Sequence, residues 1–356
     1  MPEFLDDKSM VFALAIAVLL LLVFLRAWLN LRALPVLRRT EGTRAADCMV
    51  VIPARDDEEV IARAVQSLPH DTVIVVDDAS SDQTAKVARE AGAGVVSAPP
   101  VPRGGTGKAN ACAVGAQALT SRWILFADAD TWFEAGFLDA AVAASEASGV
   151  SFLSIYPKPE PVGFLEQMLT PYLQALYFAG TNPKSNPAEA FNGQVVLARR
   201  ETYEFLGGHN AILREAVDDI RLAWLAERHR VKYALAQAPE LSHVRMYRGA
   251  KGLWRGLERQ AVRYHVGNPA RALVSLLAAG LALLWLPALV WLLLDLHWTA
   301  AVCFALVPLV CFRSWYGTTL RSLLAPLAVY AVVPFLAHAV LVGITGRQVM
   351  WKGRWV

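Results

Sequence analysis

Charged residues are scarce in this chain of 356 residues, at 18% against roughly 25% in an average soluble domain. Hydrophobic residues make up 55% of the sequence, which excludes a wholly soluble protein, and the remaining charge excludes a wholly intramembrane one. The net charge of +3 is too small for the concentrated basic face of a nucleic-acid-binding protein. No nucleic-acid partner is therefore expected.

Cysteine is also rare, and the cysteines that occur show no C-x-x-C or zinc-binding spacing. Two of the four, Cys303 and Cys311, lie in apolar runs, and the others are Cys48 and Cys112. This pattern argues against a disulfide scaffold and indicates a reducing compartment around the polar part of the chain. A G-x-G-x-x-G sequence after the first predicted strand is missing as well, which argues against dinucleotide-dependent redox chemistry.

The apolar residues are concentrated at the two ends of the chain. After a short tail at 1–9, the segment at 10–30 is long enough to span a bilayer, for which about 20 residues are needed. Its acidic leader and the lack of an A-x-A site favour a signal-anchor over a cleaved signal peptide. The basic linker at 31–47 then places the next segment in the cytoplasm, by the positive-inside rule.

A second apolar block covers residues 271–346 and contains segments at 272–294, 298–312 and 323–345. The middle segment is short. If all three spanned, the basic tail at 347–356 would end outside, against the positive-inside rule. We therefore expect the middle segment to be re-entrant or interfacial, with three spans as the alternative.

One ionisable side chain, His338, lies deep inside these apolar segments. A transporter or pump would show more intramembrane polar groups, so transport is a poor interpretation. The pattern predicts a multi-pass protein of a bacterial-type inner membrane whose central domain faces the cytoplasm.

Residues 48–245 alternate short apolar runs with segments of helical period, which predicts one open, doubly wound α/β domain. The predicted strands, all expected to be buried and parallel, are 49–52, 73–76, 94–97, 123–127 and 152–155. The predicted helices between them are 58–68, 83–91, 108–119 and 134–148. Ligands of such sheets bind at the carboxyl ends of the strands.

Acidic residues follow two of the predicted strands. Asp77 and Asp78 begin the run D-D-A-S-S-D, and Asp128 and Asp130 form a D-x-D sequence. Carboxylates at one sheet edge repel one another unless a cation or hydrogen-bond donors compensate. Their hard oxygens suit Mg²⁺ or Mn²⁺ shared with a phosphate, and the simpler alternative is that Asp128 and Asp130 are strand-exit and helix-cap residues.

A glycine-rich loop at 103–108 ends in Lys108 but is not a P-loop, because Pro102 and Ala109 occupy positions that need glycine and Ser or Thr. Lys108 at a helix start could hold a diphosphate, or the loop could be an ordinary flexible one. Further along, residues 191–194 form a turn when considered alone.

Two later segments have both a simple and a functional interpretation. Asp218 and Asp219 precede a predicted helix at 220–228, where acids complement the helix dipole. The segment 246–270 is amphipathic with a basic face, which predicts a helix along the inner leaflet, with a solvated domain helix as the alternative.

Taken in order, these motifs resemble family 2 glycosyltransferases over residues 48–356. The tail W-K-G-R resembles their membrane-anchored, glycolipid-forming branch, which includes the hopanoid-associated and carotenoid glycosyltransferases. The matching motifs are I-P-A-R at 52–55, D-D-A-S-S-D at 77–82, D-A-D at 128–130, N-G-Q at 192–194, D-D at 218–219, Q-x-x-R-Y at 260–264 and W-K-G-R at 351–354.

This resemblance implies a GT-A fold, an α/β catalytic domain with a Rossmann-like, mostly parallel sheet between membrane helices at both ends. It implies inverting transfer of a sugar from a nucleotide-sugar donor, a UDP-sugar, to a membrane lipid acceptor. The implied nucleotide-sugar-binding residues are Pro53, Ala54, Asp56, Asp77, Asp78, Lys108, Asp128, Asn192, Gly193 and Gln194. The implied metal ligands for Mg²⁺ or Mn²⁺ are Asp128 and Asp130, and the implied catalytic residues are Asp218, Asp219, Gln260, Arg263 and Tyr264.

Within this set, Asp219 matches the general base, and its desolvation should raise its pKa towards that of a working base. Asp218 replaces the family's usual Glu, and Tyr264 replaces Trp, which weakens any interpretation as a polysaccharide synthase. Two alternatives stay open at this point. One is a transferase that loads sugar onto a polyprenyl phosphate, and the other is a catalytically silent membrane adaptor.

Overall fold

The computed structural model describes residues 7–39, 47–215, 217–265, 280, 283–294, 298–345, 350–351 and 354–355. The chain forms two compact units. The first, here called the sheet unit, comprises Ala33–Glu160 and Asn182–Met246. The second, the helical unit, comprises Met1–Arg32, Pro161–Thr181 and Tyr247–Val356.

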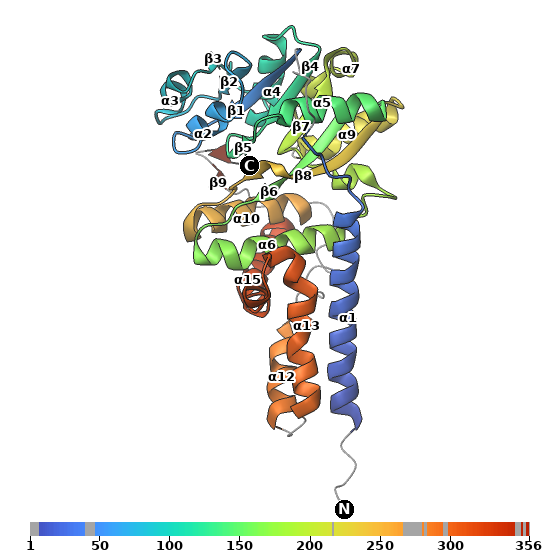
Figure 1. Ribbon diagram of the computed structural model, residues 1–356. Helices are drawn as coiled ribbons and strands as arrows, with labels where there is room; N and C mark the ends of the chain where they lie inside the picture. The colour runs from blue at the N-terminus through green and yellow to red at the C-terminus, as the bar shows by residue number, and fades with distance from the viewer. Residues whose placement is uncertain are drawn as a thin grey trace, which may run out of the picture. The chain divides into compact units, whose positions relative to one another are not determined.

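The sheet unit is built on one sheet with the strand order β3-β2-β1-β4-β7-β6-β8-β5 (Figure 1). The first four strands in that order run parallel, as the alternating pattern predicts. β7 is antiparallel to both β4 and β6. The strands are β1 (Cys48–Ala54), β2 (Val73–Asp77), β3 (Gly94–Ser97), β4 (Trp123–Ala127), β5 (Thr131–Phe133), β6 (Phe152–Pro159), β7 (Val195–Arg199) and β8 (Tyr233–Val244).

Two strand predictions need correction. β6 was expected to be one of a parallel set, but it pairs antiparallel with β7 and parallel with β8, so the sheet is mixed. β3 was expected to be buried, yet its residues are exposed or half-buried, because it forms an edge and has a partner on one side only. The rest of the strand prediction for this region is confirmed.

Helices cover both faces of the sheet because its β-branched strands are apolar on both sides. On one face Val50 and Ile52 belong to the same core as α2 and α5. On the other, Val51 and Val76 approach α4 so closely that a Cβ at Gly115 would lie 2.4 Å from Val51 Cγ1. The helices are α2 (Ile61–Gln66), α3 (Thr84–Glu90), α4 (Gly107–Gln117), α5 (Phe137–Ser148), η1 (Pro187–Ala190), α7 (Arg200–Phe205), α8 (Gly208–Ala211) and α9 (Asp218–Arg228).

The helical unit contains the apolar segments. Its helices are α1 (Asp7–Arg32), α6 (Phe164–Gly180), α10 (Gly249–His265), α12 (Trp285–Leu294), α13 (Trp298–Tyr316), α14 (Thr319–Ser322) and α15 (Ala325–Thr345). A two-stranded ribbon, β9 (Met350–Trp351) with β10 (Arg354–Trp355), ends the described part.

Within the described ranges, Val11–Arg32 is the one helix long and apolar enough by itself to cross a membrane. Ala301–Tyr316 and Leu320–Pro334 pass the same test only together, and they are bent by 113° at their junction. Such a bend suits either one broken span or a re-entrant loop. In the apolar stretch expected at 272–294, residues 272–279 and 281–282 lie outside the described residues, and α12 covers the end of the stretch.

Candidate active site

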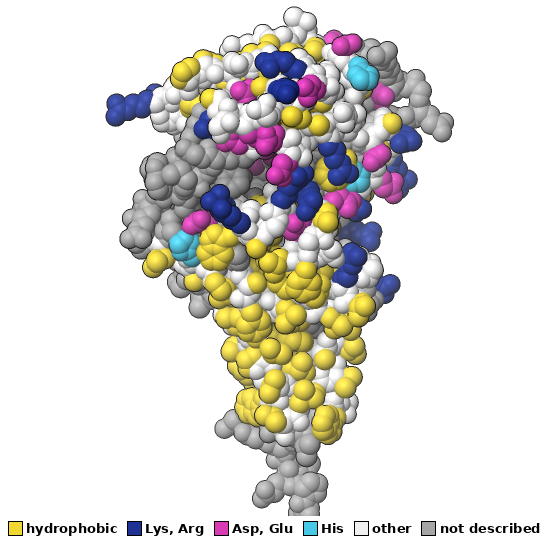
Figure 2. Space-filling view, turned by 90° about the vertical axis from the view of Figure 1, so that its left-hand side faces the viewer, with side chains coloured by type: hydrophobic (Ala, Val, Ile, Leu, Met, Phe, Trp, Pro, Cys, Tyr) yellow, Lys and Arg dark blue, Asp and Glu magenta, His cyan; other side chains and the backbone are white. Residues whose placement is uncertain are grey.

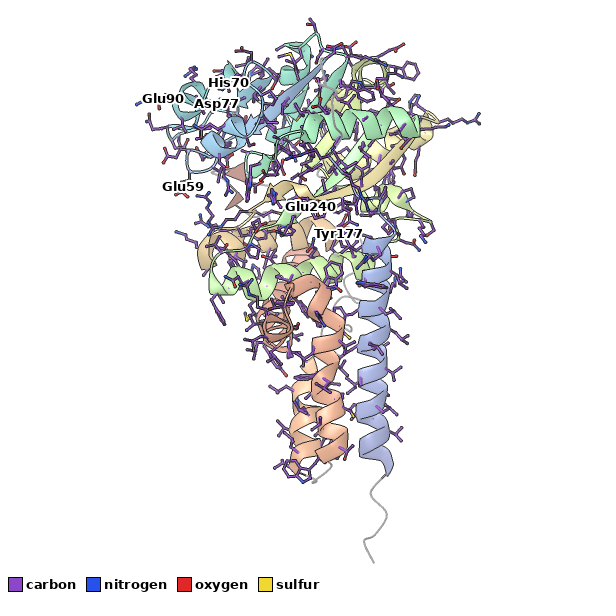
Figure 3. The ribbon with its side chains drawn as sticks, in the orientation of Figure 1. Glu59, His70, Asp77, Glu90, Tyr177 and Glu240 are labelled. Carbon is purple, nitrogen blue, oxygen red and sulfur yellow. The ribbon has the colours of Figure 1, made fainter. Side chains whose placement is uncertain are left out.

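The carboxyl ends of β1, β2 and β4 meet at one edge of the sheet. These strands are parallel neighbours, and Ala54, the last residue of β1, is in register with Asp77, the last of β2. Figure 3 shows Asp77 in this region of the sheet unit. One of its oxygens, Oδ1, is buried and has no hydrogen-bond partner among the described residues. The predicted nucleotide-binding residues Pro53, Ala54, Asp77 and Asp78 are thus brought together at this edge.

A first acidic cluster, Asp56 and Asp82, joins the loop after β1 to the loop after β2. Asp56 Oδ1 accepts hydrogen bonds from the backbone N–H and hydroxyl of Ser81, at 2.7 and 3.0 Å. Asp82 accepts from the backbone N–H groups of Thr84, at 2.9 Å, and Glu58, at 3.2 Å. Burial opposes the ionisation of Asp82, but the hydrogen bond from the Thr84 hydroxyl and these backbone hydrogen bonds outweigh it and lower the pKa of its carboxyl.

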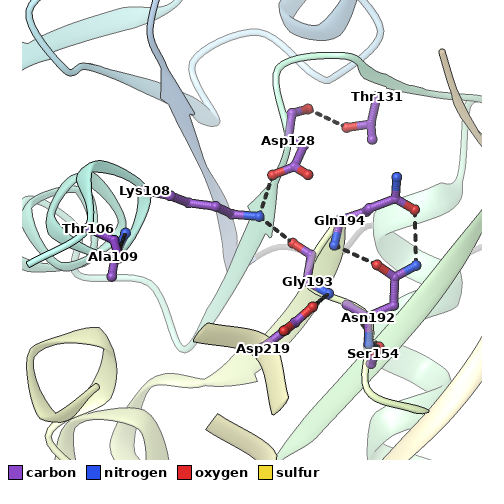
Figure 4. A network of polar contacts seen from close by, with 10 residues as sticks. All are labelled: Thr106, Lys108, Ala109, Asp128, Thr131, Ser154, Asn192, Gly193, Gln194 and Asp219. Carbon is purple, nitrogen blue, oxygen red and sulfur yellow. Dashed lines mark hydrogen bonds and ion pairs between the residues drawn. The ribbon is translucent and has the colours of Figure 1, made fainter. Parts of the chain in front are cut away.

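A second cluster consists of Lys108, Asp128, Gly193 and Asp219 (Figure 4). Lys108 Nζ lies 2.6 Å from Asp128 Oδ1 and donates a hydrogen bond of 2.9 Å to the carbonyl of Gly193. The N–H of Gly193 donates in turn to Asp219 Oδ2 at 3.0 Å. One network therefore connects the start of α4, the end of β4, the loop before β7 and the start of α9.

The N-G-Q segment at the centre of this network is rigidly held. The backbone N–H of Asn192 donates to Ser154 Oγ at 2.8 Å, and that hydroxyl donates to the carbonyl of Asn192 at 2.9 Å. The amide side chains of Asn192 and Gln194 pair at 3.0 Å, and the carbonyl of Gln194 accepts the N–H of Asp128. The segment, a simple turn in the sequence, thus links the D-x-D strand to Asp219.

Gly193 is the one residue in this turn whose size is critical. A Cβ at this position would lie 2.8 Å from Asp219 Cβ and 3.2 Å from its Oδ2. Any larger residue must displace the carboxylate of Asp219, so glycine is required here for close approach.

The electrostatic environment of Asp219 matches the expectation from its sequence position. Burial, and then the neighbouring Asp218, raise the pKa of Asp219 to about 6, while Lys108 opposes the shift. Burial also acts against the charge of Lys108, but Asp128 and Asp218 outweigh it and raise the pKa of the lysine. Near neutral pH the site therefore holds a charged Lys108 and an Asp219 that can accept a proton.

Ser154 is a site residue that sequence reasoning missed. Its side chain is fully buried in β6, where its hydroxyl accepts a hydrogen bond from the backbone N–H of Asn192 and donates one to the carbonyl of the same residue. The available signal was a single hydroxyl within the apolar run 152–155, which could be recognised as a polar anchor only once its partner was known.

The donor set at the D-x-D sequence suits a hard divalent cation. Asp130 Oδ1 is buried, and Asp128, two residues earlier, forms an ion pair with Lys108. Over the described parts of the chain, no group of three or more His, Cys, Asp or Glu side chains could hold a metal. Two carboxylates with phosphate oxygens are a usual arrangement for Mg²⁺, so the residues present fit a cation shared with a phosphorylated ligand.

Three predicted catalytic residues are not described at the level of side chains. Gln260, Arg263 and Tyr264 lie on α10, in the helical unit, and their side chains fall outside the described residues. Their roles stay predictions, whereas Asp218 and Asp219 are placed as the first two residues of α9.

Known proteins resemble part of this chain. The family model for glycosyl transferase family 2 matches residues 49–220. The 4,4'-diaponeurosporenoate glycosyltransferase of Staphylococcus haemolyticus is 37% identical over 99 residues, 26% of each chain. That of Staphylococcus aureus strain USA300 is 30% identical over 187 residues, 49% of each chain. The chain spans about half or less of the length of these curated relatives.

Among solved structures, glucosyl-3-phosphoglycerate synthase from Mycobacterium tuberculosis in complex with Mn²⁺, UDP-glucose and phosphoglyceric acid has a TM-score of 0.41 and 17% identity. The match covers 65% of this chain and 87% of that one. The region matched by the family model includes every described residue of the two clusters. Residues 49–220 are therefore a glycosyl transferase family 2 domain, homologous to the diaponeurosporenoate glycosyltransferases.

Proposed function

We propose that this protein is an inverting glycosyltransferase that moves a sugar from a UDP-sugar to the hydroxyl group of a membrane lipid. The observation that carries the proposal is the network joining Asp219, with its raised pKa, to Lys108 and Asp128 through Gly193. Inverting transfer needs one base and one region of positive charge, and this network contains both.

Asp219 acts as the general base. The oxygen of the acceptor hydroxyl attacks the anomeric carbon on the face opposite the diphosphate, and its proton goes to the Asp219 carboxylate. The bond between the anomeric carbon and the diphosphate oxygen breaks, and its electron pair leaves with the nucleoside diphosphate. A base with a pKa near 6 is ionised at neutral pH and still basic enough to assist.

Lys108 binds the diphosphate by exchanging its present contact with Asp128 for phosphate oxygens. Asp128 and Asp130 would hold Mg²⁺ or Mn²⁺, which when bound neutralises charge on the leaving diphosphate. The nucleoside contacts Pro53, Ala54, Asp56, Asp77 and Asp78 at the ends of β1 and β2, and Asn192, Gly193 and Gln194 shape the sugar site. Gln260, Arg263 and Tyr264 complete the catalytic set.

The acceptor is a lipid dissolved in the membrane. The relatives are named as glycosyltransferases of 4,4'-diaponeurosporenoate, and the apolar helix Val11–Arg32 provides a membrane anchor. The enzyme is a multi-pass protein of the inner membrane with the sheet unit in the cytoplasm, where nucleotide sugars are available.

The test is sugar transfer in isolated membranes supplied with labelled nucleotide sugars and Mn²⁺ or Mg²⁺. Label should enter organic-extractable lipid, and Asp219→Asn and Asp130→Asn should each abolish it. Asp71→Asn is the matched control, because Asp71 is an exposed turn acid whose left-handed backbone suits Asn equally. Label that survives Asp219→Asn would indicate a phosphate acceptor, which needs no base, and no label from any donor would refute the proposal.

A further inference from the structure

A buried histidine lies close to the network of Lys108, Asp128, Gly193 and Asp219 but has no role in it so far. His209, in the short helix α8, is 6% exposed. Its ring packs edge-on against that of Phe126, with the centroids 4.7 Å apart. Phe126 belongs to β4, the strand that leads into the D-x-D sequence. His209 therefore rests on the strand that carries Asp128.

Tyr203, in α7, holds this histidine through its hydroxyl group. The backbone N–H of His209 donates to Tyr203 Oη at 3.0 Å, and Oη lies 2.9 Å from His209 Nδ1. Burial lowers the pKa of His209 to about 4, although the neighbouring Asp218 opposes the shift, so the ring is neutral near neutral pH. We assign the hydroxyl hydrogen to Nδ1, because in the other tautomer it would have no partner among the described residues.

The turn between α7 and α8 is shaped for this contact. Gly207 and Gly208 both have positive φ angles, of 77° and 52°. A Cβ at Gly208 would lie 2.3 Å from Tyr203 Cζ. A larger residue at this position would push the phenol ring away from the backbone of His209, so glycine is required for the close approach.

The segment that follows His209 connects the two sides of the network. The carbonyl of Leu213 accepts the backbone N–H of Thr106 at 2.9 Å. Thr106 is the N-cap of α4 and lies two residues before Lys108. Further along the chain, α9 begins five residues after Leu213 and carries Asp219 as its second residue. A shift of this segment is therefore expected to displace Lys108 and Asp219 together.

We propose that His209, held by Tyr203, is a positioning residue that keeps residues 209–213 on β4 and thereby sets the positions of Lys108 and Asp219. The inference rests on the proposed function, in which Lys108 binds the diphosphate and Asp219 accepts the proton. His209 acts through the backbone of residues 209–213 and needs no contact with the substrate.

Two tyrosines of the sheet unit provide a matched pair of variants. Tyr203→Phe removes the hydroxyl that holds His209. Tyr233→Phe removes a hydroxyl that donates to Glu227, near the C-terminal end of α9 and therefore away from Asp219. Each variant keeps its aromatic ring and loses one hydrogen-bonded hydroxyl, but only the first should release residues 209–213.

Amide hydrogen exchange reports on this segment without any turnover. Because apolar side chains gather on the surface of the helical unit (Figure 2), the full-length protein is studied in lipid nanodiscs. In Tyr203→Phe, peptides that contain Thr106 or Leu213 should exchange at least about tenfold faster than in the wild type, while peptides from β1 keep their rates. In Tyr233→Phe, exchange at Thr106 and Leu213 should change less than about twofold.

Steady-state kinetics separate positioning from a loss of folded protein. A smaller folded fraction lowers kcat but leaves KM unchanged. Tyr203→Phe should lower kcat by about 10–100-fold and also raise KM for the nucleotide sugar, because Asp219 and Lys108 both move, and KM for the lipid should stay constant. His209→Asn keeps an acceptor oxygen for the Tyr203 hydroxyl and should retain more activity than His209→Phe.

Wild-type exchange at Thr106 and Leu213 in Tyr203→Phe would overturn the proposal, and so would kinetic constants equal to those of Tyr233→Phe. Equal losses in His209→Asn and His209→Phe would contradict a role for the bond to Tyr203. If the wild type transfers no sugar, the proposed function fails, but hydrogen exchange still decides whether Tyr203 and His209 hold the segment.

Discussion

Asp82, two residues before α3, and Asp219, the second residue of α9, both lie near a helix start in the sheet unit, yet their environments are opposite. Asp82 is solvated and accepts several hydrogen bonds, which lower its pKa. Asp219 is desolvated beside a second acid, which raises its pKa to about 6. The difference shows that the pKa of a carboxyl group depends on the hydrogen-bond donors and water around it, and not on its place near a helix start.

The largest expected effect is the difference in kcat/KM between variants of Asp219 and of Asp82. Asp219→Asn should lower kcat/KM for transfer by about 10²–10⁴-fold, the contribution typical of general base catalysis. Asp82→Asn should change it less than about threefold, because Asn retains one acceptor oxygen for the loop. Steady-state kinetics of the two variants in the same membranes measure the contrast, and comparable losses would contradict the distinction.

A methyl group at position 193 should also lower the rate of transfer, because it displaces the carboxylate of Asp219. Gly193→Ala places a Cβ 2.8 Å from Asp219 Cβ, so the carboxylate must move, and a shift of about 1 Å can cost about 100-fold in rate. Gly94→Ala is the control, because its nearest contact is an ordinary 3.7 Å on the edge strand β3. Wild-type kcat in Gly193→Ala would mean that the position of Asp219 is not critical.

The pH dependence should report the raised pKa. The log of kcat/KM should fall with a slope of one as the pH decreases through about 6, because protonated Asp219 cannot accept a proton. Lys108 opposes the shift, so Lys108→Met should move this limb to higher pH as well as weakening donor binding. A limb near pH 4 in the wild type would exclude Asp219 as a desolvated base.

The smallest expected effects are changes in the free energy of unfolding, to which the ionised Asp82 and Asp219 should contribute with opposite signs. Asp82→Ala should lower the free energy of unfolding at pH 7 by about 1 kcal/mol, since it removes hydrogen bonds at a half-buried group. The lowered pKa of Asp82 means that this contribution is present at neutral pH and lost as the pH falls through the folded-state value.

Asp219 should act in the other direction, because its folded-state pKa lies above the unfolded value of 3.8. Its ionisation destabilises the folded state above pH 6, by at most about 3 kcal/mol, and this cost disappears as the pH falls towards 4. Asp219→Asn should therefore be more stable relative to wild type at pH 7.5 than at pH 5. Denaturation midpoints at both pH values measure this, and a difference of the opposite sign would contradict the burial argument.

The predictable features of this protein are those that local patterns encode. The apolar run of β4 followed by Asp128 and Asp130 marked both a buried strand and the sheet edge where it ends. α9 was recognisable from its period and its acidic first turn. Hydrophobic period and terminal charges are properties of a few neighbouring residues, so they can be identified from sequence without knowledge of distant contacts.

The sequence by itself determined the central α/β domain, the apolar ends and the order of the acidic motifs. Only the tertiary structure decided which acid has a lowered pKa and which a raised one. That choice depends on Gly193, 26 positions before Asp219, and on Lys108, 85 positions before Gly193. It depends equally on the reversal of β7, which brings the N-G-Q turn to the end of β4. Desolvation and close contact arise between residues far apart in the chain, and no local pattern encodes them.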